Sequence, residues 1–479
     1  MRSVFQSDKL HDECGVFGMF AGSADTSMAY YALLALQHRG QESAGLAAFS
    51  GDGRLISYKD TGLVSAVFDD ARLAKFAKKK LILGHVRYAT SGTRSAINAQ
   101  PMCARTYFGN VAMAYNGTVV NADRLRRELI KDGSVFMTDV DSEIFVHLFA
   151  RYSHLGVEKA IHAIMRDVQG SFSMVLMLKD KLVAVRDPFG IRPLCLGKMG
   201  DSYFVASESS AFNATGVELV RDVEPGEIVI IDKDGFHSVP CPDEFRRDKK
   251  VCIFEYVYFA RTDSTIDTIS VHSARLRAGR ALSHVAPVEA DLVAPVPDSA
   301  MGAALGYARE SGIKFGEALV KNRYIGRTFI QPSQVMREIA VSIKLNALVS
   351  GIVANRRIIL VDDSIVRGTT SRNLVDMLRA AGAQEVHLRI SSPPVRHPCY
   401  LGVDTPSPKE LISTTNSVEE IRKRVGADSL AYLPLEELVR ATPYHEACGF
   451  CTGCFNSEYP MDIEKCKRMG LCPANGRKK

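Results

Sequence analysis

The sequence predicts an α+β region with mainly antiparallel strands, followed by an α/β region with a parallel sheet. Three observations support this. From Cys14 to about Asp243, short strands and tight turns are interrupted by few helices. The next stretch, PCPDEFRRDKK (240–250), is polar and charged, as linkers are. After it, a strand, a loop and a helix recur in that order, which is the pattern of βαβ crossovers in parallel sheets.

The composition argues against nucleic-acid-binding, membrane-spanning and secreted proteins. Lys and Arg number 60 against 54 Asp and Glu, a net charge of +6 spread along 479 residues. This excess suits small acidic ligands such as phosphates and is too weak to indicate a nucleic-acid partner. No run of 18 apolar residues indicates a membrane span, and residues 1–13 lack the apolar stretch of a secretory signal. We therefore expect a cytoplasmic protein, in which eleven cysteines favour metal ligands or nucleophiles over disulfides.

In the first region, alternation and turn residues predict hairpins. Residues 45–62, GLAAFSGDGRLISYKDTG, read as two strands joined by a Gly-Asp-Gly turn. NADRLRRELIKDG predicts a helix capped by Asn121 and stopped by Gly133, with Leu125 and Leu129 on one face. Further strands are expected in LILGHVRYAT (81–90), VAMAYNGTVV (111–120) and SFSMVLMLKDKLVAVRD (171–187).

The second region repeats one unit. Residues 290–312 read as an apolar strand, a loop at Pro297-Asp298-Ser299 and a helix that ends near Gly312. Residues 356–383 repeat this unit, and EVHLRISSPP supplies the next strand. From about Asp428 onward we expect only short helices and loops.

The stretch ILVDDSIVRGTTSR (359–372) is the strongest single signal. A buried strand ends in Asp362 and Asp363, at the edge of a parallel sheet where ligands bind. The loop at Gly368 and the helix that opens with Thr369 offer backbone N–H groups and a helix dipole to a phosphate. Two acids beside such a cradle suit the vicinal hydroxyls of a sugar or a magnesium ion. The alternative is a pair of acids that merely caps the next helix.

This stretch closely resembles the loop of type I phosphoribosyltransferases that binds phosphoribosyl pyrophosphate (PRPP). The resemblance implies a parallel sheet with helices on both faces, and it implies that Asp362 and Asp363 hold the ribose hydroxyls and Mg²⁺. VPDS (296–299) resembles the loop that faces the pyrophosphate. Many relatives have a second hydroxyl at the next position, where this chain has Ala300, so no metal contact is expected there. The residues implied to wrap the 5-phosphate are Ser364, Arg367, Gly368, Thr369 and Thr370.

An apolar run begins at Cys14, after thirteen mostly polar residues. At a chain terminus, a cysteine combines a thiol nucleophile with its own α-amine, whose ordinary pKa of about 8 suits a general base. Inside a chain that amine is an amide, so cleavage before Cys14 would create the base. Taken alone, the residue is better explained as a buried cysteine of a first strand.

Other residues of the first region favour acyl transfer. Arg87 can grip a carboxylate bidentately, and Asp141 can accept hydrogen bonds from a substrate ammonium. Asn116 and Gly117, which we expect at a tight turn, could stabilise an oxyanion through an amide side chain and a backbone N–H. Together with a thiol, these groups describe a site for the hydrolysis of the glutamine amide.

Six motifs carry a second resemblance: ECGVFG, LQHRGQESAG, GHVRYATSG, NGTVVN, DSEIF and DPFGIRPL. They are similar to the glutaminase domain of the N-terminal-nucleophile amidotransferases. Joined to the PRPP loop, they resemble the family of glutamine PRPP amidotransferases, or amidophosphoribosyltransferases, over nearly the whole chain. The resemblance implies a nucleophile at Cys14, a glutamine-binding pair of Arg87 and Asp141, an oxyanion hole of Asn116 and Gly117, and a propeptide at 1–13.

The same resemblance implies the reaction and its partners. Ammonia from glutamine passes to the second site and displaces pyrophosphate from C1 of PRPP, giving 5-phosphoribosylamine in the first step of de novo purine synthesis. Purine nucleotides are implied as feedback inhibitors, and a homo-oligomer, a tetramer or a dimer, is implied as the assembly. We expect a propeptide (1–13), an αββα glutaminase domain (14–243), a phosphoribosyltransferase domain (251–427) and a helical, cysteine-rich segment (428–479).

The run CGFCTGC places Cys448, Cys451 and Cys454 close together, while Cys252 and Cys399 lie in apolar or proline-flanked stretches. Four thiolates from distant segments could hold a zinc ion or a [4Fe–4S] cluster. The spacing of the cysteines alone does not favour either one. One branch of the family carries a cluster together with a propeptide. The resemblance therefore implies [4Fe–4S] ligands at Cys252, Cys399, Cys451 and Cys454, and no ligand role for Cys448.

The segment KNRYIGRTFIQPSQ (321–334) is basic and aromatic and has no helix or strand period. It reads either as a solvated surface loop or, by the resemblance, as the flexible loop that folds over PRPP. In the second case Lys321, Arg323 and Arg327 are available for phosphates.

Two other functions fit parts of the sequence. An amidotransferase that acts on a hexose phosphate would share the first region but lack the Asp362-Asp363 loop. A PRPP-sensing regulatory protein without amidotransferase activity would share the second region, but it would need neither Arg87 nor a leader before Cys14.

Overall fold

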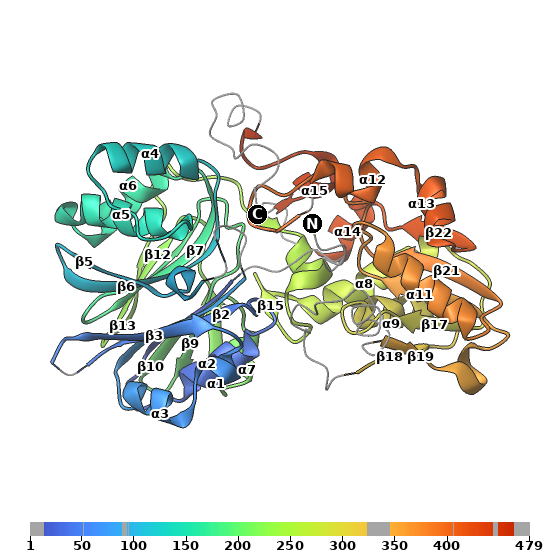
Figure 1. The fold of residues 1–479 in the computed structure, drawn as a ribbon, viewed down its shortest axis with the longest axis horizontal. Coiled ribbons are helices and arrows are strands. Elements are labelled where there is room, and N and C mark those ends of the chain that lie inside the picture. Colours follow the sequence, from blue (N-terminus) through green and yellow to red (C-terminus); the bar gives the residue numbers. More distant parts are fainter. Residues whose placement is uncertain are drawn as a thin grey trace.

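The computed structural model describes residues 14–50, 52–88, 93, 95–322, 345–405, 407–443 and 449–463. The chain forms two lobes that lie side by side, one from its first half and one from its second half (Figure 1). Within the described ranges, no helix combines the length and the apolar character needed to cross a membrane.

An antiparallel sheet forms one layer of the first lobe. Its β2 and β3 are the predicted hairpin, paired from Ser43 with Thr61 to Phe49 with Leu55. The hydrogen-bonded order is β11 (Glu218–Asp222), β9 (Cys195–Met199), β10 (Ser202–Ala206), β1 (Gly15–Phe20), β4 (Leu81–Arg87), β2 (Ser43–Phe49) and β3 (Leu55–Thr61). Its outer face packs on α1 (Met28–Ala35), α2 (Val64–Val67), α3 (Asp70–Leu73), η1 (Ala74–Phe76) and α7 (Ser210–Asn213).

A second antiparallel sheet faces the first. Its order is β13 (Gly235–Val239), β12 (Ile228–Asp232), β8 (Leu182–Arg186), β7 (Gly170–Met177), β6 (Gly109–Val119) and β5 (Met102–Thr106). Its outer face packs on α4 (Ala122–Lys131), α5 (Ser142–Tyr152) and α6 (Val157–Asp167), with the short turns η2 (Ala96–Asn98) and η3 (Ser153–Leu155) nearby in sequence. The predicted helix is α4, and its Leu125 and Leu129 are buried. Asn121 precedes it as expected but does not cap it, because its side chain bonds Asp167 O and Gln169 N.

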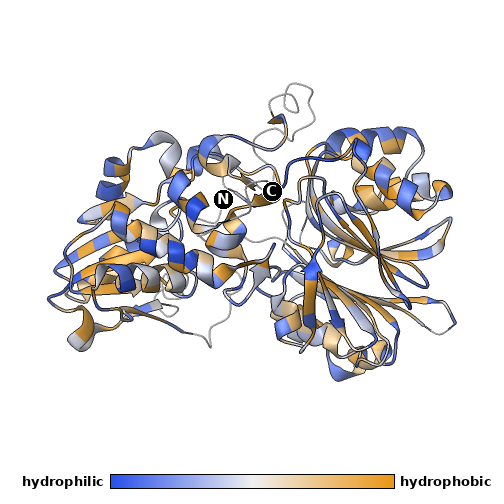
Figure 2. Cartoon of the chain, turned by 180° about the vertical axis from the view of Figure 1, so that it is seen from behind, coloured by the Kyte–Doolittle hydropathy of each residue, from blue (hydrophilic) through white to orange (hydrophobic). Residues whose placement is uncertain are grey.

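The two sheets bury a shared apolar core. Val16 and Leu83 of one sheet belong to the same buried cluster as Ala114 and Val175 of the other. Figure 2 shows the apolar residues concentrated along these strands, with more polar helices outside. The lobe is therefore an αββα sandwich, in which alternate residues of each strand face the partner sheet or a helix layer.

The predicted turn at Asn116-Gly117 is wrong. Both residues lie within β6, where Asn116 pairs with Ser173 and Gly117 pairs with Phe172 of β7. Asn-Gly favours a turn in isolation, but the ladder with β7 continues to Val119 and overrides that local preference.

The second lobe is built on a parallel sheet. The order is β17 (Leu292–Pro295), β20 (Arg357–Asp362), β21 (Glu385–Ile390) and β22 (Ser429–Tyr432), and each neighbouring pair is parallel. Its helices are α8 (Val271–Val285), α9 (Met301–Ser311), α11 (Thr369–Ala380), α12 (Ile412–Thr415), α13 (Val418–Val425) and α14 (Leu435–Ala441). The expectation of only helices and loops after Asp428 is wrong at two short strands, β22 and β23 (Gly449–Cys451), which are partly exposed and therefore lack a strong apolar pattern.

Smaller elements complete this lobe. They are β14 (Lys250–Cys252), the π-helical turn η4 (Glu255–Phe259), β15 (Thr265–Ile266), β16 (Ile269–Ser270), β18 (Leu319–Lys321), β19 (Leu345–Ala347), the π-helical turn η5 (Val349–Val353), η6 (Pro408–Glu410), β23 (Gly449–Cys451) and α15 (Gly453–Asn456). β14 and β23 pair in parallel, so the start of this lobe is joined to residues near 450.

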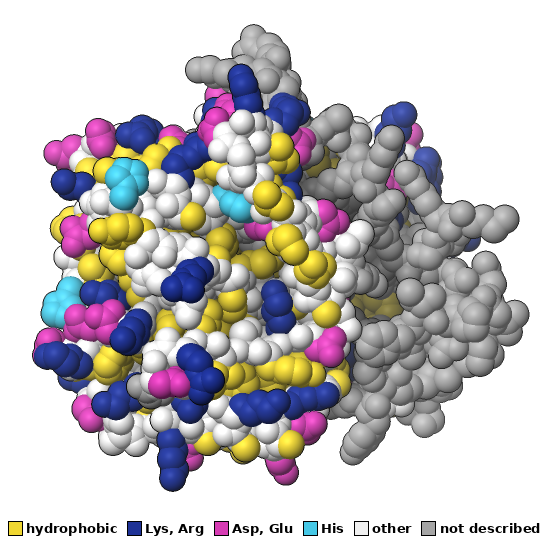
Figure 3. All heavy atoms as spheres, turned by 60° about the vertical axis from the view of Figure 1, so that its left-hand side comes forward, with side chains coloured by type: hydrophobic (Ala, Val, Ile, Leu, Met, Phe, Trp, Pro, Cys, Tyr) yellow, Lys and Arg dark blue, Asp and Glu magenta, His cyan; other side chains and the backbone are white. Residues whose placement is uncertain are grey.

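Charge is dispersed over the surface of the first lobe. On the face in Figure 3, Lys and Arg side chains are interspersed with Asp and Glu. This arrangement agrees with the even spread of charged residues along the sequence.

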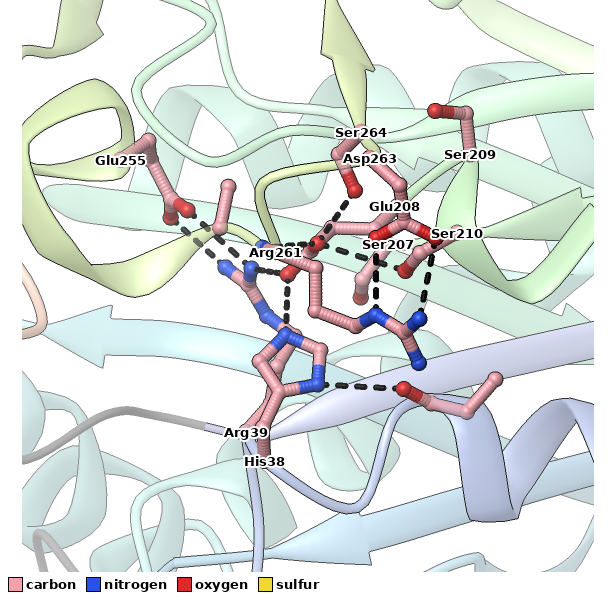
Figure 4. A network of polar contacts seen from close by, with 12 residues as sticks. His38, Arg39, Ser207, Glu208, Ser209, Ser210, Glu255, Arg261, Asp263 and Ser264 are labelled. Carbon is pink, nitrogen blue, oxygen red and sulfur yellow. Dashed lines mark hydrogen bonds and ion pairs between the residues drawn. The ribbon is translucent and has the colours of Figure 1, made fainter. Parts of the chain in front are cut away.

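A buried network of ion pairs connects the lobes (Figure 4). Arg39, which follows α1, pairs with Glu208 of the first lobe and bonds Glu255 of η4 at 2.7 and 3.1 Å. Glu208 also accepts hydrogen bonds from His38 Nε2 (2.8 Å) and Ser264 Oγ (2.7 Å). Arg39, Glu208 and Glu255 are all at most 1% exposed, so each charge depends on its partners for stabilisation.

We expect the Glu208→Gln substitution to destabilise the protein by about 3–5 kcal/mol at pH 7, because it leaves Arg39 buried without one of its carboxylates. Burial alone would raise the pKa of Glu208, but the charges of His38 and Arg39 outweigh it and hold that pKa well below its usual range. The stabilisation is therefore present above the ordinary Glu pKa of about 4.3 and is lost as the pH falls towards the folded-state value.

Denaturant unfolding at pH 7 and at lower pH measures this effect, with Glu128→Gln as the matched control. Glu128 forms an exposed pair with Arg124 at 3.0 Å, whose loss should change stability by less than about 1 kcal/mol. The difference in the free energy of unfolding between wild type and Glu208→Gln should decrease below about pH 4. A difference that does not change with pH would contradict the stabilisation of the fold by ionised Glu208.

Candidate active sites

The thiol and the guanidinium of the first predicted site meet at the edge of the first sheet. Cys14 immediately precedes β1, and the β1–β4 register pairs Gly15 with Val86, which brings Cys14 beside Arg87. The Cys14 thiol donates a hydrogen bond to Tyr88 O at 3.7 Å. Cys14 is 9% exposed and Arg87 is 3% exposed. A thiol and a guanidinium are thus fixed at the ends of neighbouring strands.

The guanidinium of Arg87 lies close to the carboxylate of Glu42. Its Nη1 lies 4.0 Å from Glu42 Oε2, and Arg87 pairs in register with Ser43 of β2. The backbone of this segment is close-packed, since a Cβ added to Gly40 would lie 2.4 Å from the carbonyl carbon of Val86. The guanidinium is therefore oriented by β2 and the loop before it.

Asn116 and Gly117 reach the site from the opposite sheet. The Asn116 side chain is fully buried, and neither its Nδ2 nor its Oδ1 has a hydrogen-bond partner. Unpaired buried amides are costly, so this one favours a ligand that supplies the missing bonds. Gly117 has φ = +150°, and a Cβ there would lie 2.0 Å from Ser171 O. Only glycine fits this backbone position.

Asp141 lies next to the same strand. It immediately precedes α5, and its Oδ2 accepts a hydrogen bond from the Val119 N–H at 3.1 Å. Because Val119 ends β6, this contact ties the acid to the strand that carries Asn116 and Gly117. The structure thus places Cys14 beside Arg87 in the first sheet, Asn116 and Gly117 on β6 of the facing sheet, and Asp141 against the end of β6.

The sequence analysis missed two residues that hold this strand. The backbone of Tyr115, next to Asn116, donates to Gln100 Oε1 (2.8 Å) and accepts from Gln100 Nε2 (3.4 Å). His85 Nε2 contacts Tyr115 O at 2.9 Å, and burial lowers the pKa of His85 to about 3, so the ring stays neutral. His85 could have been found because it shares a strand face with Arg87, whereas Gln100 has no such signal.

The second predicted site lies at the carboxyl edge of the parallel sheet. Asp362 ends β20, and the Asp363 N–H donates to Asp362 Oδ1 at 2.9 Å. Asp363 accepts hydrogen bonds from Ser364 Oγ (2.7 Å) and from Ser299 Oγ. The loop after β17 and the loop after β20 therefore meet at these two buried acids, as expected for strands that end at one edge.

A cradle for an anion follows the acids. Gly368 precedes α11 with φ = +85°, and a Cβ there would lie 2.7 Å from Ile412 Cδ1. Thr369 and Thr370 are the first residues of α11, where backbone N–H groups lack partners within the helix. Arg367 lies 3.5 Å from Glu410 in an ion pair at the rim of this turn. The geometry suits a phosphate.

The pyrophosphate-facing loop is close to a basic side chain. Lys321 of β18 donates a hydrogen bond to Asp298 Oδ2 at 2.6 Å. Ala300 is buried just before α9. Arg323, Arg327 and the rest of the predicted flexible loop lie outside the described residues, as do the predicted propeptide 1–13 and Cys448.

The four predicted cluster ligands converge from three segments. The β14–β23 register pairs Cys252 directly with Cys451, and Cys454 follows within α15. Cys399 lies in the loop after β21, where its sulfur accepts hydrogen bonds from the Leu401 N–H (3.3 Å) and Val403 N–H (3.4 Å). The backbone carbonyl of Cys454 accepts bonds from the N–H groups of Arg396 and His397, both at 3.0 Å, so the last segment is fixed against the Cys399 loop.

The charges of these thiols influence one another. Burial, followed by the charge of the nearby Cys399, raises the pKa of Cys451 to about 12. Burial also raises the pKa of Cys252 and Cys454, with Cys399 and Cys451 contributing in both cases. The eight described cysteines form no disulfide. Within the described ranges, no three His, Cys, Asp or Glu side chains are arranged around a point where one metal ion could sit.

The chain is similar to known proteins over most of its length. The model of a glutamine amidotransferase domain family matches residues 85–214. Amidophosphoribosyltransferases from Bacillus subtilis and Archaeoglobus fulgidus are each 46% identical to the chain over 95% of its length and over 95% and 100% of theirs. The solved glutamine PRPP amidotransferase of B. subtilis, complexed with ADP and GMP, is 45% identical with a TM-score of 0.87, covering 94% of this chain and 98% of that one. A structure described as the allosteric regulatory enzyme of purine biosynthesis matches with a TM-score of 0.88 and 45% identity, covering 94% of this chain and 97% of its own.

Proposed function

The chain belongs to the amidophosphoribosyltransferase family, and from this premise we propose how its two sites divide the reaction. The enzyme takes nitrogen from glutamine and transfers it to PRPP. The observation that supports the division is the presence of a thiol site in one lobe and an acid-phosphate site in the other. The regulatory alternative without amidotransferase activity would not need Cys14 or the four residues proposed to act with it.

At the first site, Arg87 binds the α-carboxylate of glutamine and Asp141 binds its α-ammonium. The Cys14 thiolate attacks the carboxamide carbon, and the Asn116 amide and Gly117 N–H stabilise the oxyanion that forms. The intermediate collapses to a thioester as the amide nitrogen takes up a proton and leaves as ammonia, and water then hydrolyses the thioester. In a chain processed before Cys14, the free α-amine takes the thiol proton and later returns it. The orphaned amide of Asn116 supports this role.

At the second site, the α11 N-terminus and its preceding turn bind the 5-phosphate of PRPP through Ser364, Arg367, Gly368, Thr369 and Thr370. Asp362 and Asp363 accept hydrogen bonds from the ribose hydroxyls. Ammonia attacks C1, the C1–oxygen bond to pyrophosphate breaks, and the ammonium loses a proton to give 5-phosphoribosylamine. Lys321 and Arg323 are proposed to neutralise phosphate charge, a role that requires Lys321 to leave Asp298.

Isotope labelling tests this assignment. With glutamine that carries ¹⁵N in its amide, and with PRPP, the 5-phosphoribosylamine should contain the label, and one pyrophosphate should appear for each labelled product. Trapped product without ¹⁵N, or glutamate release without pyrophosphate, would contradict the coupled reaction.

Mg²⁺ is the metal proposed at the second site. The carboxylates of Asp362 and Asp363 are hard oxygen donors, which Mg²⁺ takes one or two at a time together with substrate phosphates. When bound, the ion would offset the charge of the departing pyrophosphate. Two adjacent buried carboxylates support this use of the site.

A [4Fe–4S] cluster is proposed for Cys252, Cys399, Cys451 and Cys454. Two features support a fit: four thiols converge from three segments, and backbone N–H groups already donate to the Cys399 sulfur, as they do around Fe–S sites. When bound, the cluster would join the Cys451 segment to the lobe, because its ligands lie on β14, β23 and the loop after β21.

We expect the protein purified without oxygen to be brown and to contain about four irons per chain. The Cys451→Ser variant should lose most of the visible absorbance and become sensitive to proteases near residue 450. Cys448→Ser is the matched control, since we propose no ligand role for it. Metal analysis and visible spectra check this result; a colourless, air-stable protein with zinc would rule out the cluster.

The remaining assignments extend the sequence predictions. We place the glutaminase domain at 14–243, the phosphoribosyltransferase domain at 251–427 together with β22, and the cysteine-rich segment after it. The nucleotides bound in the B. subtilis relative support feedback inhibition by purine nucleotides. A cytoplasmic location, a propeptide at 1–13 and a homo-oligomer stay predictions from the sequence.

A further inference from the structure

A turn of the first lobe lies against the strand that carries Cys252. The Lys250 N–H donates to Phe189 O at 2.7 Å, and the Cys252 N–H donates to Ile191 O at 3.1 Å. The other edge of β14 is paired with β23. One of the four thiols therefore lies between a segment of the glutaminase lobe and the Cys451 strand.

The turn is held by one buried acid. The Asp187 carboxylate accepts hydrogen bonds from the N–H groups of Phe172 (3.2 Å), Phe189 (2.9 Å) and Ile191 (3.1 Å). Asp187 is fully buried. Two of these donors, Phe189 and Ile191, are in the turn itself. Asp187 therefore fixes the conformation of the backbone that is hydrogen-bonded to β14.

Arg192, the next residue in this turn, reaches both cysteine-bearing segments. Its Nη1 contacts Glu255 Oε1 at 3.3 Å, three residues after Cys252. Its Nη2 donates to Leu401 O at 3.3 Å, two residues after Cys399. Arg192 is 1% exposed, so its charge lies beneath the surface together with the thiols.

The positive charge of Arg192 has the sign that favours a site of thiolates. The guanidinium is buried and is bonded to the segments that carry Cys252 and Cys399, so its charge is fixed close to them. Thiols bind metals as thiolates, so a site of four thiolates accumulates negative charge where water is scarce. A fixed cation beside two of them reduces that cost.

We propose that Arg192 is a positioning residue and counter-charge for the four-thiol site, supplied by the glutaminase lobe. It fixes the Cys252 and Cys399 segments through two separate hydrogen bonds and offsets part of the thiolate charge. This inference rests on the proposed cluster. It follows that the cluster is retained only when the two lobes are docked, since the residue that supports it belongs to the other lobe.

The test compares Arg192→Gln, Arg192→Lys and the wild type, all purified without oxygen. Arg246→Gln is the matched control, because Arg246 is exposed in the linker and pairs only at the surface with Asp243 at 3.1 Å. Iron and sulfide per chain and the rate of visible bleaching in air are measured. Far-ultraviolet circular dichroism checks that each variant is folded.

Substitution of a residue that supports the ligands of a metal site typically lowers metal affinity by about 10–100-fold. The Arg192→Gln variant should therefore bleach about tenfold faster than the wild type and retain less iron. Arg192→Lys keeps the charge but loses the planar fork, so its rate should lie between those of the wild type and Arg192→Gln. Arg246→Gln should match the wild type. This order of bleaching rates would support a role for both the positive charge and the hydrogen bonds of Arg192.

Wild-type rates in Arg192→Gln would overturn the inference. If that variant does not fold, Arg192→Lys decides, because wild-type bleaching there would contradict the positioning role. A wild-type protein without iron and sulfide would instead contradict the proposed cluster itself, so the two failures are distinguishable.

Discussion

The Cys14→Ala variant should lose glutamine-dependent synthesis by on the order of 10⁴-fold while retaining synthesis from ammonia. In the proposed reaction the Cys14 thiol is the nucleophile that releases ammonia from glutamine, so without it no thioester should form. The second site is in the other lobe and does not use this side chain. Parallel assays with glutamine and with an ammonium salt, at fixed PRPP, measure the two activities.

Cys103→Ala is the matched control for this prediction. Cys103 lies on β5, is exposed and, like Cys14, forms no disulfide. It should leave both activities at the wild-type level. Equal loss of both activities in Cys14→Ala would mean that Cys14 supports the fold and is not the nucleophile.

The Asp363→Asn variant should lose synthesis from both nitrogen sources by about 100-fold or more, because PRPP is held less accurately at C1. Asp363 accepts hydrogen bonds from Ser299 and Ser364, which join two loops of the site. An amide in its place removes a charge that the metal needs and offers donors where two hydroxyls already donate.

Asp376→Asn is the control on the same helix-bearing segment. Asp376 lies on α11 and forms an exposed ion pair with Arg372 at 3.7 Å, and the loss of this pair should be neutral. Product formation as a function of PRPP and Mg²⁺ concentration measures the effect, and glutaminase turnover in the absence of PRPP should persist. Wild-type kinetics with ammonia in Asp363→Asn would remove Asp363 from the PRPP site.

The local structure of both lobes could be predicted where pattern and turn chemistry agree. The β2–β3 hairpin, α4, and the strand–loop–helix around Asp362 all follow from the apolar period and from glycine positions, although Asn121 does not cap α4 as expected. The acids and the following helix N-terminus form one contiguous stretch, so their chemistry could be identified before any packing was known.

Features that depend on pairing across the chain could not be predicted. The local sequence Asn116-Gly117 favours a turn, but pairing with β7 makes these residues part of an extended strand. That pairing cannot be seen in the local sequence. Gln100 was missed because it acts on the backbone of Tyr115, a contact that no spacing reveals. The same holds for Arg192, whose partners Glu255 and Leu401 come from other segments.

The pairing of β14 with β23 has a consequence for the order of events during translation. Cys252 and Cys451 are roughly 200 residues apart, which a ribosome adds in about 10–40 s. The two sheets of the first lobe, in contrast, come from one contiguous stretch that ends at β13. The nascent chain can therefore finish the glutaminase lobe well before β14 finds its partner strand. During that interval the first lobe would be folded while β14 still lacks its partner strand, so the joined two-lobed chain forms only after residue 451 has been made.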